Sequence, residues 1–262
     1  MALPSERIRA LGDELYDAWK AAQQIPPLTE REPGIDVDDA YRVQLRTVDR
    51  RLQAGERPVG KKIGITSRAV MEMLKVDQPD FGHLLSGMAF ADGDTLQAKR
   101  FCQPRGEGEI AFLLKRDLTG PGLSNADVLA ATESVTPAFE IVDSRVTDWK
   151  IKIQDTIADN GSAAAYVLGN QSADPRGIDL MTIGMVLEKN GEVIGTGAGA
   201  ASMGNPVIAV TWLANKLGSF GIQLKAGEVI LSGSLSIMFP IKAGDSLRMR
   251  LGGIGSVSCR FE

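Results

Sequence analysis

The sequence predicts an α+β protein, with a helical N-terminal segment followed by a mostly antiparallel or mixed β core. Apolar residues in the first third recur at spacings of three and four, which is typical of amphipathic helices. After Gly82 they form short runs separated by glycine, as strands do. No internal repeat or low-complexity linker divides the chain. We expect a smaller, mainly helical N-terminal region at 1–82 and a larger β region at 83–262.

The N-terminal region is expected to contain two amphipathic helices and a shorter third one. Ser5 can cap the first helix, which ends before the proline pair at 26–27. The second helix covers about 38–52 and stops near a glycine. Thr66 or Ser67 then caps the short helix.

Most of the remaining chain is expected to form strands. The Asn190-Gly191 pair supplies the positive φ angles of a tight hairpin turn between two of them. One further helix begins at Asn205, its cap, with Pro206 at the first helical position. The expected strands cover residues 109–115, 135–142, 163–168, 185–189, 192–194, 247–251 and 257–261.

The composition favours a globular protein that acts on a small molecule. Of the 262 residues, 44% are apolar and 24% are charged, and the net charge is −4. No basic stripe is present, so nucleic acid is a poor partner. No apolar run approaches a membrane span, and the charged start of the chain does not match a signal peptide. Two distant cysteines suit a reducing compartment. We therefore expect a cytoplasmic protein without membrane or nucleic-acid partners.

Glu107 and Glu109 stand two residues apart at the start of an expected strand. Such side chains point to the same side, about 6–7 Å apart along the backbone, and oxygen ligands at about 2.0–2.2 Å from Mg²⁺ are then possible. Alone, the pair would more often be two exposed glutamates. However, the following run IAFLL is apolar on both faces, and Glu140 lies within another apolar run. Buried carboxylates need a partner or a metal ion, and oxygen ligands favour Mg²⁺, Mn²⁺ or Ca²⁺ over zinc.

Other polar residues could complete a site, although each has an ordinary explanation. Three carboxylates with one divalent ion keep a net negative charge, so an anionic substrate needs another cation. Lys61 or Lys62 could supply it from a short strand, but a solvated lysine pair is the usual outcome. Asp80 and Ser162 lie in segments that also read as turns. His83, the only histidine, excludes a multi-histidine metal site and is expected first as a loop residue.

Seven segments of the chain carry a family resemblance. In order, they are GKKIGITS, QPDFGHLL, RGEGEIAFLL, FEIVDSRVTDW, DTIADNGSAA, GTGAGAASMGNP and LGGIGSVSCRF. Together they resemble the 2-keto-4-pentenoate hydratase family, within the fumarylacetoacetate-hydrolase superfamily, over about positions 40 to 262. The resemblance implies a mixed β-sheet roll with a Mg²⁺ or Mn²⁺ site, and residues 83–262 as the catalytic domain.

The resemblance also assigns roles to individual residues. Lys62 matches the lysine of the family's G-[KR]-K-[IM]-G-[LIV]-T-S motif and Asp80 the acidic residue of its QPDFG motif, and these two are the expected acid/base pair. Thr66, from the same motif as Lys62, and Ser162, from the DN-[AG]-S motif, are expected to bind the substrate. The family's metal-binding carboxylates correspond to Glu107, Glu109 and Glu140.

The activity that the resemblance implies is that of a hydro-lyase. Water is added to 2-hydroxypenta-2,4-dienoate (2-oxopent-4-enoate), or a close analogue, to give a 4-hydroxy-2-oxo acid in the meta-cleavage degradation of aromatic compounds. The resemblance further implies a homo-oligomer, a pentamer or a decamer, and the decarboxylase or aldolase of the same pathway as protein partners.

Three alternatives stay open. The sister 4-oxalocrotonate decarboxylases share the metal carboxylates and the lysine, but their motif reads KMGLTS and an apolar residue replaces Asp80. Hydration needs a group that handles the protons of water, so Asp80 favours the hydratase. A nicotinamide enzyme is suggested by the glycine loop at 195–199, which lacks the G-x-G-x-x-G spacing and a preceding parallel strand. A non-catalytic relative would be expected to have lost a metal carboxylate.

Overall fold

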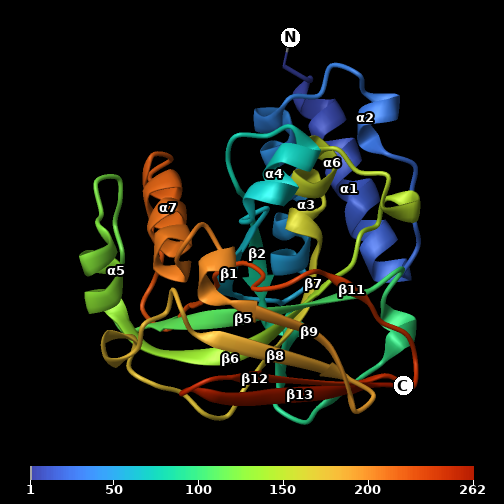
Figure 1. The fold of residues 1–262 in the computed structure, drawn as a ribbon. Helices are drawn as coiled ribbons and strands as arrows, with labels where there is room; N and C mark the ends of the chain where they lie inside the picture. The colour runs from blue at the N-terminus through green and yellow to red at the C-terminus, as the bar shows by residue number, and fades with distance from the viewer. Residues whose placement is uncertain (1) are drawn as a thin grey trace.

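The structure, a computed structural model, describes residues 2–262 as helices packed over two β-sheets (Figure 1). The N-terminal helices gather at one end of the molecule, above the larger sheet. Helices α2, α5 and α6 were not predicted from the sequence, because each has seven residues or fewer and shows little helical period; α4, equally short, was predicted together with its cap at Thr66 or Ser67. The helices are α1 (Ser5–Ala21), α2 (Leu28–Arg31), α3 (Val37–Gln53), α4 (Arg68–Leu74), α5 (Asn125–Ala131), α6 (Ile153–Ala158) and α7 (Pro206–Gly218).

The larger sheet has eight strands in the order β2-β1-β10-β5-β6-β7-β3, with β11 also paired to β5. It is mixed: β1 pairs with β10, and β3 with β7, in parallel, and the other pairs are antiparallel. Its strands are β1 (Pro58–Gly64), β2 (Asp80–Leu85), β3 (Ala89–Ala91), β5 (Arg105–Leu114), β6 (Thr132–Val142), β7 (Ala163–Leu168), β10 (Val229–Leu231) and β11 (Phe239–Pro240).

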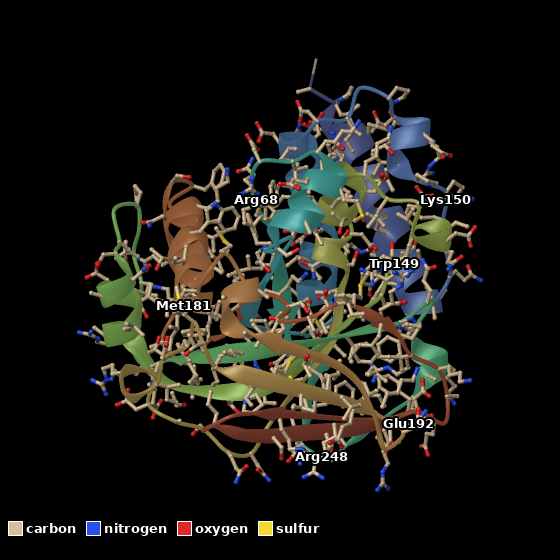
Figure 2. The ribbon with its side chains drawn as sticks, viewed as in Figure 1. Arg68, Trp149, Lys150, Met181, Glu192 and Arg248 are labelled. Atoms are coloured by element: carbon tan, nitrogen blue, oxygen red, sulfur yellow. The ribbon has the colours of Figure 1, made fainter. Side chains whose placement is uncertain are left out.

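The second sheet has five strands in the order β4-β13-β12-β8-β9. Glu192 and Arg248 project into solvent from it (Figure 2). The predicted hairpin at Asn190-Gly191 is confirmed, and the glycine loop at 195–199 largely continues β9, which is antiparallel to β8. Its strands are β4 (Thr95–Leu96), β8 (Gly184–Lys189), β9 (Glu192–Ala198), β12 (Ser246–Leu251) and β13 (Gly255–Phe261).

The two faces of the larger sheet have different neighbours. Strands β12 and β13 lie against β6, so one face packs on the second sheet, and alternate residues such as Ile110, Phe112 and Phe139 fill the core between them. The larger sheet is curled, so that β2 also contacts β7. Its other face is on the inside of this curl and is called the inner face. Small side chains such as Ala111 and Ala138 lie on this inner face. The predicted α+β roll with N-terminal helices is confirmed.

Local sequence signals explain where several helices begin. Ser67 caps α4 by accepting a hydrogen bond from the N–H of Val70 at 3.2 Å, and Asn205 caps α7, both as predicted. The prediction that Ser5 caps α1 is wrong: Ser5 is already helical, and Pro4 stands at the cap position without a side-chain hydrogen bond. Proline there has a fixed φ but no side-chain oxygen to offer.

The segment around His83 differs from its prediction. Asp80, expected in a turn, and His83, expected in a loop, both lie in β2, which is buried along its whole length. The signal was missed because its residues, Asp-Phe-Gly-His, do not alternate between polar and apolar. The division of the chain at residue 82 stays a prediction; β1 and β2, which precede or span that residue, pair within the large sheet. Within residues 2–262, no helix is long and apolar enough to cross a membrane.

Candidate active site

Strand register brings three carboxylates together on the inner face of the larger sheet. Glu107 and Glu109 lie two residues apart on β5, so their side chains point to the same side. Glu140 on β6 is the direct partner of Glu107, and opposed residues of an antiparallel pair share a face. One carboxylate oxygen from each residue lies within 4.8 Å of the other two. The three glutamates singled out in the sequence therefore form one cluster.

The carboxylates of the cluster have fewer hydrogen-bond donors around them than three buried negative charges need. Glu109 Oε2 accepts a hydrogen bond from the N–H of Gly233 at 2.8 Å, but Glu109 Oε1 and both Glu140 oxygens are buried without a hydrogen-bond partner among residues 2–262. Burial raises the pKa of all three carboxyls; that of Glu140 rises to about 7, although nearby Lys62 opposes the shift. A hard divalent cation would bind these oxygens and favour their charged forms, so the residues fit one.

Lys62 supplies a positive charge on the same face. It pairs in register with Leu231 on β10, which pairs with Ala111, two residues from Glu109. The Lys62 ammonium lies 3.4 Å from Glu140 Oε1 and donates a hydrogen bond to the carbonyl of Gly161 at 2.9 Å. Burial alone would lower the pKa of Lys62, but the surrounding carboxylates, Glu140 first, outweigh it and raise the pKa. Lys62 is therefore a buried, charged ammonium group and not a solvated lysine.

Asp80 meets Lys62 beside Gly64. Asp80 is the register partner of Gly64 across β1 and β2, and it is only 1% exposed. A Cβ atom at position 64 would overlap Asp80 Oδ1 and lie 3.0 Å from Lys62 Nζ, so both groups converge where glycine leaves space. Burial raises the pKa of Asp80, and Lys62 partly offsets this. Asp80 Oδ1 is buried without a hydrogen-bond partner within the described chain, so it is free to accept one.

The two residues expected to bind substrate have different surroundings. Thr66 is buried, and its side chain lies against Gly233, whose N–H binds Glu109. Thr66 is thus next to the carboxylate cluster. Ser162 is also buried, but its hydroxyl lies 3.2 Å from the hydroxyl of Thr156. Ser162 adjoins the site through Gly161, while its own hydroxyl is engaged on α6.

The second lysine of the pair does not join the cluster. Lys61 points to the opposite side of β1, where its ammonium lies 3.3 Å from Glu228 Oε1. Its register partner is His83, whose pKa burial lowers to about 3, with a further contribution from Lys61. Alternation along one strand therefore separates the two lysines, and of the two candidate cations Lys62 is the one beside the glutamates.

Two backbone groups at the site were not found from the sequence. The N–H of Gly233 holds Glu109, and the carbonyl of Gly161 holds Lys62. Gly161 lies in the DN-[AG]-S motif, from which Ser162 was chosen in the sequence analysis as the functional residue, and the glycine was not considered. Gly233 follows a short strand and carries no pattern of its own.

Comparison with known proteins gives consistent results. Residues 63–262 match the family model for the C-terminal domain of fumarylacetoacetate (FAA) hydrolase. A 2-hydroxyhexa-2,4-dienoate hydratase of Comamonas testosteroni is 52% identical over 97% of both chains. A 2-hydroxypent-2,4-dienoate hydratase of Pseudomonas putida is 58% identical over 82% of this chain and 97% of its own length.

A solved structure has nearly the same fold. The 4-oxalocrotonate decarboxylase of Pseudomonas putida G7, complexed with magnesium and adipate, superposes with a TM-score of 0.97 at 36% sequence identity. The superposition covers 100% of this chain and 99% of the decarboxylase. The fold alone therefore does not separate hydration from decarboxylation, whereas the hydratases are more similar in sequence.

Proposed function

The chain belongs to the 2-keto-4-pentenoate hydratase family of the fumarylacetoacetate hydrolase superfamily, and we propose that it adds water to 2-hydroxypenta-2,4-dienoate or a close analogue. The product is a 4-hydroxy-2-oxo acid formed during meta-cleavage degradation of aromatic compounds. One observation carries the proposal beyond family membership. A charged lysine and a buried aspartate converge at Gly64, on the same sheet face as the three glutamates.

Glu107, Glu109 and Glu140 are proposed to hold one Mg²⁺ or Mn²⁺ ion. Magnesium is present in the solved decarboxylase, and the buried oxygens without hydrogen bonds fit such an ion. When bound, the ion supplies Lewis-acid polarisation of the substrate's carboxylate and C2 oxygen. Because three carboxylates exceed the charge of a divalent ion by one, Lys62 offsets that excess and so lowers the repulsion of an anionic substrate.

The chemistry left to the protein's own side chains is proton transfer. In the first stage the substrate's enol oxygen loses its proton and C5 gains one, which gives a conjugated 2-oxo-3-enoate. In the second stage a water molecule loses a proton, its oxygen bonds to C4, and C3 gains a proton. Asp80 is the proposed acceptor of the water proton, because burial and its unpartnered oxygen make it a better base than a solvated carboxylate.

Lys62 has a complementary role. Its ammonium is kept charged by the neighbouring carboxylates, so it can donate hydrogen bonds to negative charge that develops on the substrate. Thr66, next to Gly233 and Glu109, is proposed to contact the substrate at the edge of the site. Ser162 is proposed to orient substrate or water through the hydrogen-bonding capacity of its hydroxyl that the contact with Thr156 does not use.

Parallel ultraviolet assays test the proposal. Purified protein with Mg²⁺ is mixed with 2-hydroxypenta-2,4-dienoate in one cuvette and with 4-oxalocrotonate in the other. We expect the dienoate absorbance to disappear with formation of a 4-hydroxy-2-oxo acid, and little change with 4-oxalocrotonate. The opposite pattern, with release of CO₂, would identify the sister decarboxylase activity instead.

Assembly and location are further proposals. We expect a homo-oligomer, a pentamer or a decamer, and association with the decarboxylase or aldolase of the pathway in the cytoplasm. The mass of the purified protein by analytical ultracentrifugation tests the first expectation. A monomer at micromolar concentration would refute it.

A further inference from the structure

The turn that carries Gly161 has an unusual backbone. Asn160, Gly161 and Ser162, which form the short 3-10 turn η4, have φ angles of +57°, +61° and +57°. Only glycine adopts this left-handed region freely, and asparagine does so more readily than most other residues. Three such residues in a row persist only where the surrounding structure fixes them, as is common at functional sites.

The Asn160 side chain is the first of two groups that fix the turn. Its Oδ1 accepts a hydrogen bond from the N–H of His83 at 2.8 Å, and its Nδ2 donates one to the carbonyl of His83 at 2.9 Å. The amide thus imitates a neighbouring strand along the edge of β2 that faces away from β1. All four polar groups are buried, so loss of the amide would leave backbone groups of β2 without partners.

A buried ion pair is the second group. Asp159 precedes the turn, and its carboxylate accepts hydrogen bonds from the Arg145 N–H at 2.8 Å and from Arg145 Nε at 2.6 Å. Arg145 Nη2 also donates to the Asp159 carbonyl at 2.8 Å. Both side chains are buried. The residue before the turn is therefore held by three contacts to a single arginine.

The fixed turn determines where Lys62 can lie. A Cβ atom at either Gly82 or Gly161 would be 3.2 Å from Lys62 Cδ, so the alkyl chain runs through a slot between these two glycines. At the end of the slot, the ammonium binds the Gly161 carbonyl at 2.9 Å and faces Glu140 at 3.4 Å. A Cβ at position 82 would also overlap the Asn160 carbonyl, so the turn lies directly on β2.

We propose that Asn160 is a positioning residue for the reaction: by fixing the left-handed turn on β2, it aims the Gly161 carbonyl and so places the Lys62 ammonium between Asp80 and the glutamates. Arg145 and Asp159 support the same turn from its other side. The inference rests on the proposed role of Lys62 in dienoate hydration. Asn160 itself touches Lys62 only through the backbone of its neighbour, so its effect is on geometry.

The test compares two asparagines that differ in location. Asn190, in the β8–β9 hairpin, also has a left-handed backbone, with φ +56°. Its side chain also accepts a hydrogen bond from the Ser246 N–H at 2.8 Å and donates one to Asp245 Oδ1 at 2.9 Å, with a longer contact from Ser246 Oγ at 3.5 Å. Asn160→Gly and Asn190→Gly therefore remove the same kind of interaction without adding backbone strain, and only the first lies beside Lys62.

The measurement is kcat and KM for 2-hydroxypenta-2,4-dienoate with Mg²⁺, normalised to the amount of protein that binds Mn²⁺. We expect Asn160→Gly to lower kcat by about 10²-fold, the usual effect of misplacing a reacting group by roughly 1 Å. KM should stay within a few-fold, and Asn190→Gly should match the wild type in kcat. If Asn160→Gly does not fold, Asn160→Asp is measured in the same way: it keeps the acceptor for the His83 N–H but loses the donor to the His83 carbonyl, so its kcat should also fall below that of Asn190→Gly.

Two outcomes would overturn the inference. One is an Asn160→Gly kcat equal to that of Asn190→Gly. The other is a loss that disappears after normalisation to Mn²⁺-binding protein, since it would reflect folding alone. Failure of the proposed function is distinguishable, because the wild type and Asn190→Gly would then both lack turnover.

Discussion

Replacement of Asp80 by asparagine separates a chemical role from a structural one. Asp80 is buried at the start of β2, and its Oδ1 accepts no hydrogen bond within residues 2–262. Asparagine has nearly the same shape and fits the same space beside Gly64, so the thermal midpoint should change little. Because the raised pKa of Asp80 reflects burial of its charge, removing that charge should not lower stability.

Catalysis should respond differently. Asparagine cannot accept the proton of water, so kcat for 2-hydroxypenta-2,4-dienoate should fall by roughly 10²–10⁴-fold, the usual contribution of a positioned acid/base group. That loss corresponds to about 3–5 kcal/mol of transition-state stabilisation. KM and Mg²⁺ affinity should stay within a few-fold, because the glutamates and Lys62 are unchanged. The assay is steady-state kinetics with a thermal melt on the same sample. A near-normal kcat would remove Asp80 from the mechanism and favour the decarboxylase.

Other perturbations follow from the same geometry. Gly64→Ala should reduce kcat because the new Cβ overlaps Asp80 Oδ1. Gly177→Ala is the matched control, since a Cβ there would meet no atom within 4 Å. Equal kcat values for the two variants would show that the space at Gly64 is unimportant. EDTA should abolish turnover and Mg²⁺ or Mn²⁺ restore it, and full activity in metal-free protein would refute the metal site. Glu109→Gln should weaken Mg²⁺ binding by calorimetry yet leave the metal-free protein as stable or more so, since repulsion falls; unchanged affinity would exclude Glu109 as a ligand. Because the pKa of Glu140 is raised to about 7, Mg²⁺ binding should displace protons and strengthen as pH rises towards 7, and a pH-independent affinity between pH 5 and 7 would contradict this.

Much of the fold could be predicted from the sequence where periodicity is long and one-sided. Helices α1, α3 and α7 and the alternating strands β12 and β13 were found because one side of each faces a core. Strand β2 was not, since it is buried on both faces and begins with Asp80, a residue that usually signals a turn. Its charge is compatible with burial because Lys62 lies nearby on the neighbouring strand, which local sequence cannot show.

The candidate site could be predicted only in part from local sequence, because some of its contacts depend on the pairing of distant strands. The i and i+2 spacing of Glu107 and Glu109 depends on one strand and was readable, but the pairing of Glu107 with Glu140 depends on the register between two strands. The separation of Lys61 from Lys62 follows from strand alternation and could have been predicted. The contribution of Gly233, which comes from a distant loop, could not.

Proton NMR of the reaction in D₂O tests the proposed hydration most directly. Wild-type protein with Mg²⁺ and 2-hydroxypenta-2,4-dienoate should yield 4-hydroxy-2-oxopentanoate whose C5 methyl group carries one deuterium, because C5 takes its new proton from solvent before water bonds to C4. Addition of EDTA at the start should prevent formation of this product. Unchanged dienoate in the presence of Mg²⁺, or labelled product formed equally well with EDTA, would contradict a metal-assisted hydration at the glutamate cluster.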